Sequence, residues 1–250
     1  TPIIVETDGG MVPIVETDAA QQDKRKGKKL RWSEAKICLA HPQGSNTLAF
    51  GGTLQGDVDT AGQCLFDCAV QAGFGTSTPI HGVGDGAHWI ADQVEKQFGA
   101  QGSYLIDFFH VCDYLSAAGK AITSDVQEHK TWMDEQKIRL KTDQAAAVIQ
   151  ELKPHLESPA VADSEAPVRQ CHRYLSKRAD QLNYQRAIKR GLPIGSGETR
   201  KCPPLRCPAA FETPRRVVEP TQRRAYVGSA TRSGKPTLAK LLAENFKRPI

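Results

Sequence analysis

The sequence has no long hydrophobic run, no signal peptide and no initiator methionine. Its apolar runs extend over only a few residues, as in Tyr104-Leu105-Ile106, whereas a helix that crosses a bilayer needs about 20. This absence predicts a protein with no membrane-spanning segment. Because the chain begins at Thr1, directly in a β-branched pattern, we expect an internal start or a truncated product.

Paired cysteine motifs are also missing. The seven cysteines are odd in number and form no paired C-x-x-C spacing, which argues against a secreted disulfide framework and against a zinc site of that type. We therefore expect a reducing, cytoplasmic compartment. Cys64 and Cys68 lie four residues apart and are interpreted as the core face of a helix.

Charge is distributed unevenly along the chain. Residues 199–250 hold 12 Lys and Arg against three Asp and Glu, a net charge of +9, and seven of the 15 prolines. The rest of the chain has a net charge of −4, since the whole chain carries +5. A basic, proline-rich segment of this kind is typical of a disordered extension, and such segments can bind nucleic acid.

Hydrophobic periodicity predicts an α/β fold. Residues 61, 65, 68, 69 and 72, and later 90, 94 and 98, show helical spacing, and residues 114–190 are mostly helical with breaks near 154 and 158–167. Asp8-Gly9-Gly10 is interpreted as a tight turn or bulge between two strands. Period-2 and β-branched patterns predict the strands, of which the early ones form an antiparallel meander: 2–7, 13–17, 30–41, 47–54, 79–84 and 102–111.

Two aspartates stand out at glycine-flanked strand ends. Asp8 precedes Gly9 and Gly10, and Asp85 lies between Gly84 and Gly86. If their strands are neighbours, the two carboxylates meet at one edge of the sheet. Hard divalent cations prefer oxygen ligands, and two metals roughly 3.5–4 Å apart can activate an attacking oxygen and stabilise a leaving one. The ordinary alternative for each aspartate is a turn residue.

Four ordered motifs resemble the Kra-type DDE transposases of bacterial insertion sequences, whose catalytic core is RNase H-like. The resemblance covers about residues 2–198 and implies an RNase H-like mixed sheet with flanking helices and a helical insertion before the third acid. It also implies Asp8 and Asp85 as metal-binding acids and Asp107 and His110 as a D-x-x-H element. For His110 the structural alternative is a buried imidazole at a helix start. The motifs are DGGMVPI (8–14), GVGDGAHWI (82–90), DFFHVCDYL (107–115) and LPIGSG (192–197).

The third acid departs from the family pattern. After G-S-G and two variable residues the family carries Glu, and this chain has Arg200 at that place. Glu198 falls on the first variable position. Either Glu198 substitutes as a catalytic and metal-binding residue, or the triad is incomplete.

A frameshift accounts for this departure. Residues 199–207 can be encoded as ACT CGA AAG TGC CCA CCG CTA CGT TGT, a choice of codons whose neighbouring frame reads Glu-Ser-Ala-His-Arg-Tyr-Val, the continuation that the resemblance implies. A frameshift also explains the abrupt change in composition after Glu198. The predicted organisation is a catalytic core over 1–111, a helical insertion over 112–190, the start of the third-acid motif over 191–198 and a basic, disordered tail over 199–250.

The predicted function is metal-dependent DNA strand cleavage and transfer in transposition. The resemblance implies Mg²⁺ or Mn²⁺ in a two-metal site, transposon ends and target DNA as partners, a homo-oligomer assembled on DNA, no membrane partner, and a bacterial, nucleoid-associated location. The alternatives are an inactive remnant or non-catalytic DNA-binding fragment and, less favoured by the motifs, another RNase H-like nuclease. Lys24–Lys29 (KRKGKK) is either a phosphate contact or a solvated loop.

Overall fold

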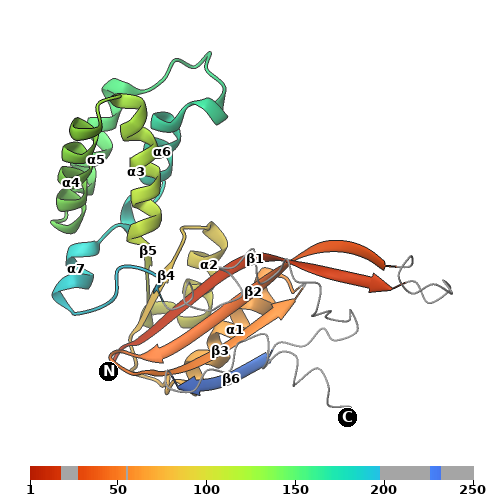
Figure 1. The fold of residues 1–250 in the computed structure, drawn as a ribbon. Helices are drawn as coiled ribbons and strands as arrows, with labels where there is room; N and C mark the ends of the chain where they lie inside the picture. Colours follow the sequence, from red (N-terminus) through yellow and green to blue (C-terminus); the bar gives the residue numbers. More distant parts are fainter. Residues whose placement is uncertain (18–27, 55, 198–225, 232–250) are drawn as a thin grey trace, which may run out of the picture. The chain divides into compact units, whose positions relative to one another are not determined.

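A computed structural model of the chain describes residues 1–17, 28–54, 56–197 and 226–231 (Figure 1). By internal contacts the chain divides into two compact units. The first comprises Thr1–Gly82, His88–Ser103 and the described residues from Ser196 onward. The second comprises Val83–Ala87 and Tyr104–Gly195.

A mixed β-sheet has the strand order β5-β4-β1-β2-β3-β6. The first three strands form the predicted antiparallel meander, with Ile3 opposite Pro42 at one end of the β1–β2 ladder and Thr17 opposite Lys28 at the other. These strands pair with one another along much of their length because their β-branched residues suit a pleated surface. The strands are β1 (Ile3–Thr17), β2 (Lys28–Pro42), β3 (Thr47–Leu54), β4 (Ile80–Gly84), β5 (Gly102–Ile106) and β6 (Tyr226–Thr231).

The predicted turn at Asp8-Gly9-Gly10 is wrong, because β1 is continuous through it. Gly9 pairs with Lys36 and Gly10 with Ala35, so the backbone groups of both glycines lie in the ladder with β2. A side chain at Gly9 would approach the Glu34 carboxylate to 2.8 Å. The glycine pair therefore lies within a strand and does not mark a change of direction.

The β1–β2 ladder extends beyond β3 as a two-stranded ribbon, residues 11–17 and 28–34 (Figure 1). β3 pairs with β2 only between Ala35 and Ala40, so the ribbon has no partner from β3. Residues on one face of the ribbon include the exposed side chains of Met11, Leu30 and Trp32, the last 53% exposed. This face is an apolar surface on the first unit.

The helices of the first unit follow the predicted periodicity. Helix α1 (Val58–Gln71) buries Cys64 and Cys68 on its core face, as expected, and neither forms a disulfide. The Asp57 carboxylate caps its start, accepting from the Thr60 amide at 2.7 Å, and Gly73 follows its end with φ +96°. Helix α2 (His88–Phe98) ends before Gly99, as predicted.

The second unit is predominantly helical, as predicted for residues 112–190. Pro154 lies in a short 3-10 turn, and no α-helix is present between Leu152 and Pro167. The predicted boundary between 111 and 112 falls inside α3, because the chain enters that helix directly after β5. The α-helices are α3 (Phe108–Ile122), α4 (Val126–Lys141), α5 (Ala145–Leu152), α6 (Pro167–Ser176) and α7 (Tyr184–Lys189).

The predicted tail over 199–250 lies outside the described residues except for 226–231. These six residues form β6, which pairs antiparallel with β3 from Thr47 opposite Thr231 to Gly52 opposite Tyr226. The sequence predicted no packed structure for them. Within the described ranges, no helix combines the length and the apolar composition needed to cross a membrane.

Candidate acidic site at the ends of β4 and β5

The strands β4 and β5 run parallel and end side by side. The Ser103 hydroxyl donates to the Ile80 carbonyl at 2.9 Å, and four residues further along both strands the Asp107 amide donates to the Gly84 carbonyl at 2.6 Å. The connection through α2 provides the crossover that parallel strands require. Asp85 and Asp107, each the first residue after its strand, therefore lie at the same sheet edge, where open α/β sheets bind ligands.

Asp85 occupies a tight turn between β4 and α2. Its side chain is partly exposed, and its Oδ1 accepts a hydrogen bond from the Ala87 amide at 2.9 Å. Gly86 adopts φ +83°, and an added Cβ there would lie 2.3 Å from the Tyr174 hydroxyl. Glycine is therefore required at 86 both by the left-handed backbone and by the close approach of the tyrosine.

Asp107 is completely buried and caps α3. Its Oδ1 accepts from the Phe109 amide at 2.7 Å and from the His110 amide at 3.2 Å. These are two of the donors that an α-helix leaves unpaired at its start. The side chain that the resemblance assigns to the D-x-x-H element thus stabilises a helix start in this structure.

His110 lies in the first turn of α3 and is half-buried. Its ring contacts the Tyr114 and Tyr174 rings edge-on, with centroids 5.5 and 6.0 Å away. The structural alternative of an imidazole that caps the helix does not hold, because Asp107 is the cap. Its position on the turn that follows Asp107 keeps the imidazole in the same unit as Asp85.

The LPIGSG motif lies against the start of α3. The Phe108 amide donates to the Ile194 carbonyl at 2.8 Å. A Cβ added at Gly195 would lie 2.9 Å from the Phe109 ring and 3.7 Å from the Asp107 Oδ1. The fourth motif thus packs on the third, whereas Glu198 and Arg200 lie outside the described residues.

Asp8 lies within β1, opposite Ile37, and belongs to the first unit. Its predicted placement at a strand end is wrong, because β1 continues to Thr17. The strand that carries it is the neighbour of β4 in the sheet.

Three side chains that the sequence did not single out bind the Asp85 turn. The Tyr174 hydroxyl donates to the Asp85 carbonyl at 2.7 Å, the Arg178 Nε donates to the Gly86 carbonyl at 2.8 Å, and the Gly86 amide donates to the Tyr104 hydroxyl at 3.1 Å. Burial raises the pKa of Tyr104 and of Tyr174. Both hydroxyls therefore stay protonated at neutral pH. Only their aromatic and basic character marks them in the sequence.

The described donors suit a hard cation in type but do not form a complete ligand set. Carboxylate oxygens are the ligands that Mg²⁺ prefers. Asp85 offers a partly exposed carboxylate, but Asp107 is buried and occupied as a cap. Within the described ranges, no group of three or more His, Cys, Asp or Glu residues could hold a metal ion.

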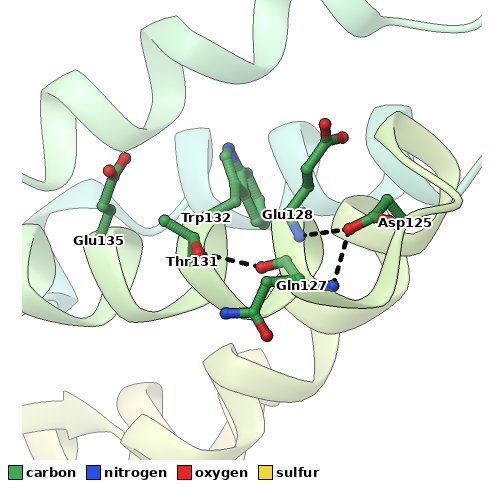
Figure 2. Close-up of a pocket in the computed structure, with 6 residues that line it drawn as sticks. All are labelled: Asp125, Gln127, Glu128, Thr131, Trp132 and Glu135. Carbon is green, nitrogen blue, oxygen red and sulfur yellow. Dashed lines mark hydrogen bonds between the residues drawn. The ribbon is translucent and has the colours of Figure 1, made fainter.

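A separate shallow pocket of about 450 Å³ follows α4 (Figure 2). The Asp125 carboxylate accepts from the Gln127 and Glu128 amides at 2.9 and 2.8 Å, so it is the cap of α4. The three acidic side chains that line the pocket would repel a DNA phosphate. None of the site residues predicted from the sequence lines this pocket. The lining residues are Asp125, Gln127, Glu128, Thr131, Trp132 and Glu135.

Comparisons with known proteins found no match for this chain among protein-family models, curated proteins or solved structures. The four motifs and the geometry at the ends of β4 and β5 are therefore the features that point to a function.

Proposed function

We propose that the chain is the catalytic core of a DDE-type DNA transposase, which cleaves and joins DNA strands with Mg²⁺ or Mn²⁺. The observation that carries this proposal is the convergence of separate motifs in one unit. Asp85 and Asp107 follow two adjacent parallel strands, and the LPIGSG motif packs on the helix that Asp107 starts. These motifs are separated by many residues in the chain, so their proximity is not a consequence of local sequence.

The sheet topology supports an RNase H-like core. Strands β1, β2 and β3 form an antiparallel meander. In the sheet β2 and β3 follow on one side of β1, and β4 and β5 lie on its other side. This arrangement is compatible with an RNase H-like fold, and it makes the Asp8 strand the neighbour of the strand that Asp85 follows.

In this proposal Asp8, Asp85 and a third acid hold the metal ions. Bound divalent metal would activate the attacking oxygen and stabilise the leaving oxygen of the phosphodiester. The Ala87 amide restricts the Asp85 carboxylate to one orientation by binding its Oδ1. Asp107 contributes by fixing the start of α3, the helix whose first turn carries His110.

The third position determines whether the chain as written is active. Arg200 stands where the family has Glu, and a cation there would oppose the binding of a second metal ion. Glu198 is two residues away, a rotation of about 200° if the segment is helical. We therefore expect weak or no catalysis from this chain, which corresponds to the alternative of an inactive remnant that binds DNA.

A nicking assay on supercoiled plasmid tests the proposal. We expect a frame-corrected chain, with Glu in place of Arg200 and the family-like continuation, to nick DNA with Mn²⁺ and to lose this activity with Asp8→Asn or Asp85→Asn. The matched control is Asp92→Asn, which neutralises an exposed acid on α2. Activity that survives Asp85→Asn would refute the assignment, and equal activity of the uncorrected chain would show that Glu198 suffices.

A further inference from the structure

The turn that carries Asp85 is held by side chains from the helical part of the second unit. The Tyr174 donor lies 89 residues, and the Arg178 donor 92 residues, from the carbonyl groups that they bind. Both donors act on backbone oxygens of Asp85 and Gly86 and leave the Asp85 carboxylate to other partners. A turn that only connects a strand to a helix does not need hydrogen bonds from side chains so distant in the sequence.

The two donors support one another. The Arg178 guanidinium carbon lies 4.4 Å above the Tyr174 ring, and its Nη1 also donates to the Tyr174 carbonyl at 3.3 Å. The Tyr174 ring also stacks on the Tyr114 ring, with centroids 4.1 Å apart and planes 11° from parallel. A planar guanidinium and a stacked phenol have little rotational freedom, so both donors point at the turn in a defined geometry.

The turn is also constrained at Gly86. Gly86 approaches Tyr174 so closely that no Cβ fits, and its amide is bound by Tyr104 on β5. With two carbonyls and one amide held, the backbone that directly follows the Asp85 side chain is fixed. The remaining bond, from the Ala87 amide to Asp85 Oδ1, then orients the carboxylate itself.

We propose that Tyr174 and Arg178 are positioning residues that aim the Asp85 carboxylate by fixing the Asp85–Gly86 turn. The inference deepens the proposed function, on which the metal-binding role of Asp85 rests. Neither residue touches the reacting atoms. Their effect is transmitted through two backbone carbonyl groups, so a helical insertion controls the geometry of an acid on the sheet.

Amide hydrogen exchange of the full chain, followed by NMR, tests the positioning directly. Tyr174→Phe removes the hydroxyl but keeps both ring contacts, and we expect the Gly86 and Ala87 amides to exchange about fivefold faster. Arg178→Lys keeps the charge but loses the planar fork, with an expected change in the same direction. The control Tyr114→Phe removes the hydroxyl of the stacked neighbour and should leave both amides unchanged. Unaltered exchange at Leu115, buried in α3, shows that each variant is folded.

Mn²⁺ binding, measured by the free-ion EPR signal, provides the functional readout. We expect Asp85→Asn to weaken binding most and Tyr174→Phe to weaken it by a smaller factor. Unchanged exchange in both variants at the turn would overturn the inference, and so would faster exchange with unchanged Asp85-dependent affinity. If wild type and Asp85→Asn bind Mn²⁺ equally, the proposed metal site fails, and the exchange rates alone then decide whether the turn is held as inferred.

Discussion

The Asp107 carboxylate combines full burial with two hydrogen bonds to helix amides. A buried carboxylate is costly unless its oxygens are bound, and the start of α3 provides donors at the required place. The motif assigns it to catalysis, whereas its contacts assign it to the stability of α3. The two roles make different demands on the side chain, and substitutions can separate them.

We expect Asp107→Ala to lower the free energy of unfolding by about 1 kcal/mol, because two amides of α3 lose their acceptor. Asp107→Ser retains a capping oxygen and should recover most of that loss. Urea denaturation followed by circular dichroism measures both. If alanine and serine are equally destabilising, capping is not the source of the effect.

The position of a single residue could be predicted from the sequence where neighbouring residues determine it. Asp85 could be placed directly after a buried strand because glycines flank it, and the structure confirms that position. Asp8 has the same local pattern but lies inside a strand, since pairing with β2 stabilises an extended Gly9-Gly10. Tyr174 could not be connected to Asp85 at all, because only the tertiary fold brings the two together.

Among the elements, α6 receives an unusual cap from outside its own sequence neighbourhood. Glu157 accepts from the Val168 amide at 2.9 Å and the Arg169 amide at 2.8 Å, although it precedes them by 11 and 12 residues in the chain. Partial burial alone would raise the pKa of Glu157, but these amides outweigh it and the pKa lies below its ordinary value. The negative charge also suits the positive end of the helix dipole.

We expect Glu157→Gln to cost about 0.5 kcal/mol at neutral pH. Because the folded-state pKa is lowered, this stability is present above the ordinary Glu pKa and is lost as the pH falls through the folded value. Urea midpoints of wild type and variant should therefore differ at pH 7 and converge once the pH has fallen below the folded-state pKa of Glu157. Glu165→Gln, an exposed acid in the same connecting segment, should have no effect at either pH.

The β1–β2 ribbon is the element in which a DNA contact can be tested. Lys28 and Lys29 are exposed at its end, next to the basic run that begins at Lys24. A two-stranded ribbon has dimensions that fit a major groove. The apolar face formed by Met11, Leu30 and Trp32 lies on the same two strands.

We expect the double substitution Lys28→Gln and Lys29→Gln to weaken binding to duplex DNA and to reduce its salt dependence. The slope of log K against log salt should fall by about 1.8, since each phosphate contact contributes about 0.9. Fluorescence anisotropy over a salt series measures both quantities. Lys130→Gln with Lys137→Gln on α4 is the matched control, and an equal slope in both double variants would favour a solvated loop.

The elements themselves were largely predictable. The bounds of β3 and the ends of α1 and α2 follow from hydrophobic period and from glycines, which are local signals. The end of β5 was predicted too late, because Tyr104 to Val111 is apolar apart from Asp107 and His110, and a buried strand and a helix start share that pattern. The cap at Asp107 is the signal that separates them.

For the whole molecule, the α/β class with a mixed sheet was predictable and the division into units was not. The class follows from alternation of two hydrophobic periods. The division into units places Val83–Ala87 with the residues from Tyr104 onward. As a result, the ends of β4 and β5 belong to the second unit and their starts to the first. No sequence pattern marks such a division within a strand.

The tail gives a prediction for the intact chain. A frame-shifted segment has no selected hydrophobic period, and seven prolines interrupt any helix, so we expect limited proteolysis to cut first after about residue 199. Mass spectrometry of the early fragments measures this. The frame-corrected chain is the control and should resist cutting there, while a protected tail in the chain as written would contradict the frameshift.

The distance along the chain between Asp85 and the residues that hold its turn has a consequence for synthesis. A ribosome adds about 5–20 residues each second, so the 92 residues between Gly86 and Arg178 take roughly 5–20 s to follow. During that interval the nascent sheet can form, but the Asp85–Gly86 turn still lacks its hydrogen bonds from Tyr174 and Arg178. The Asp85 carboxylate reaches its final orientation only when the helical segment has emerged, and a polypeptide released earlier would carry the acid without the means to aim it.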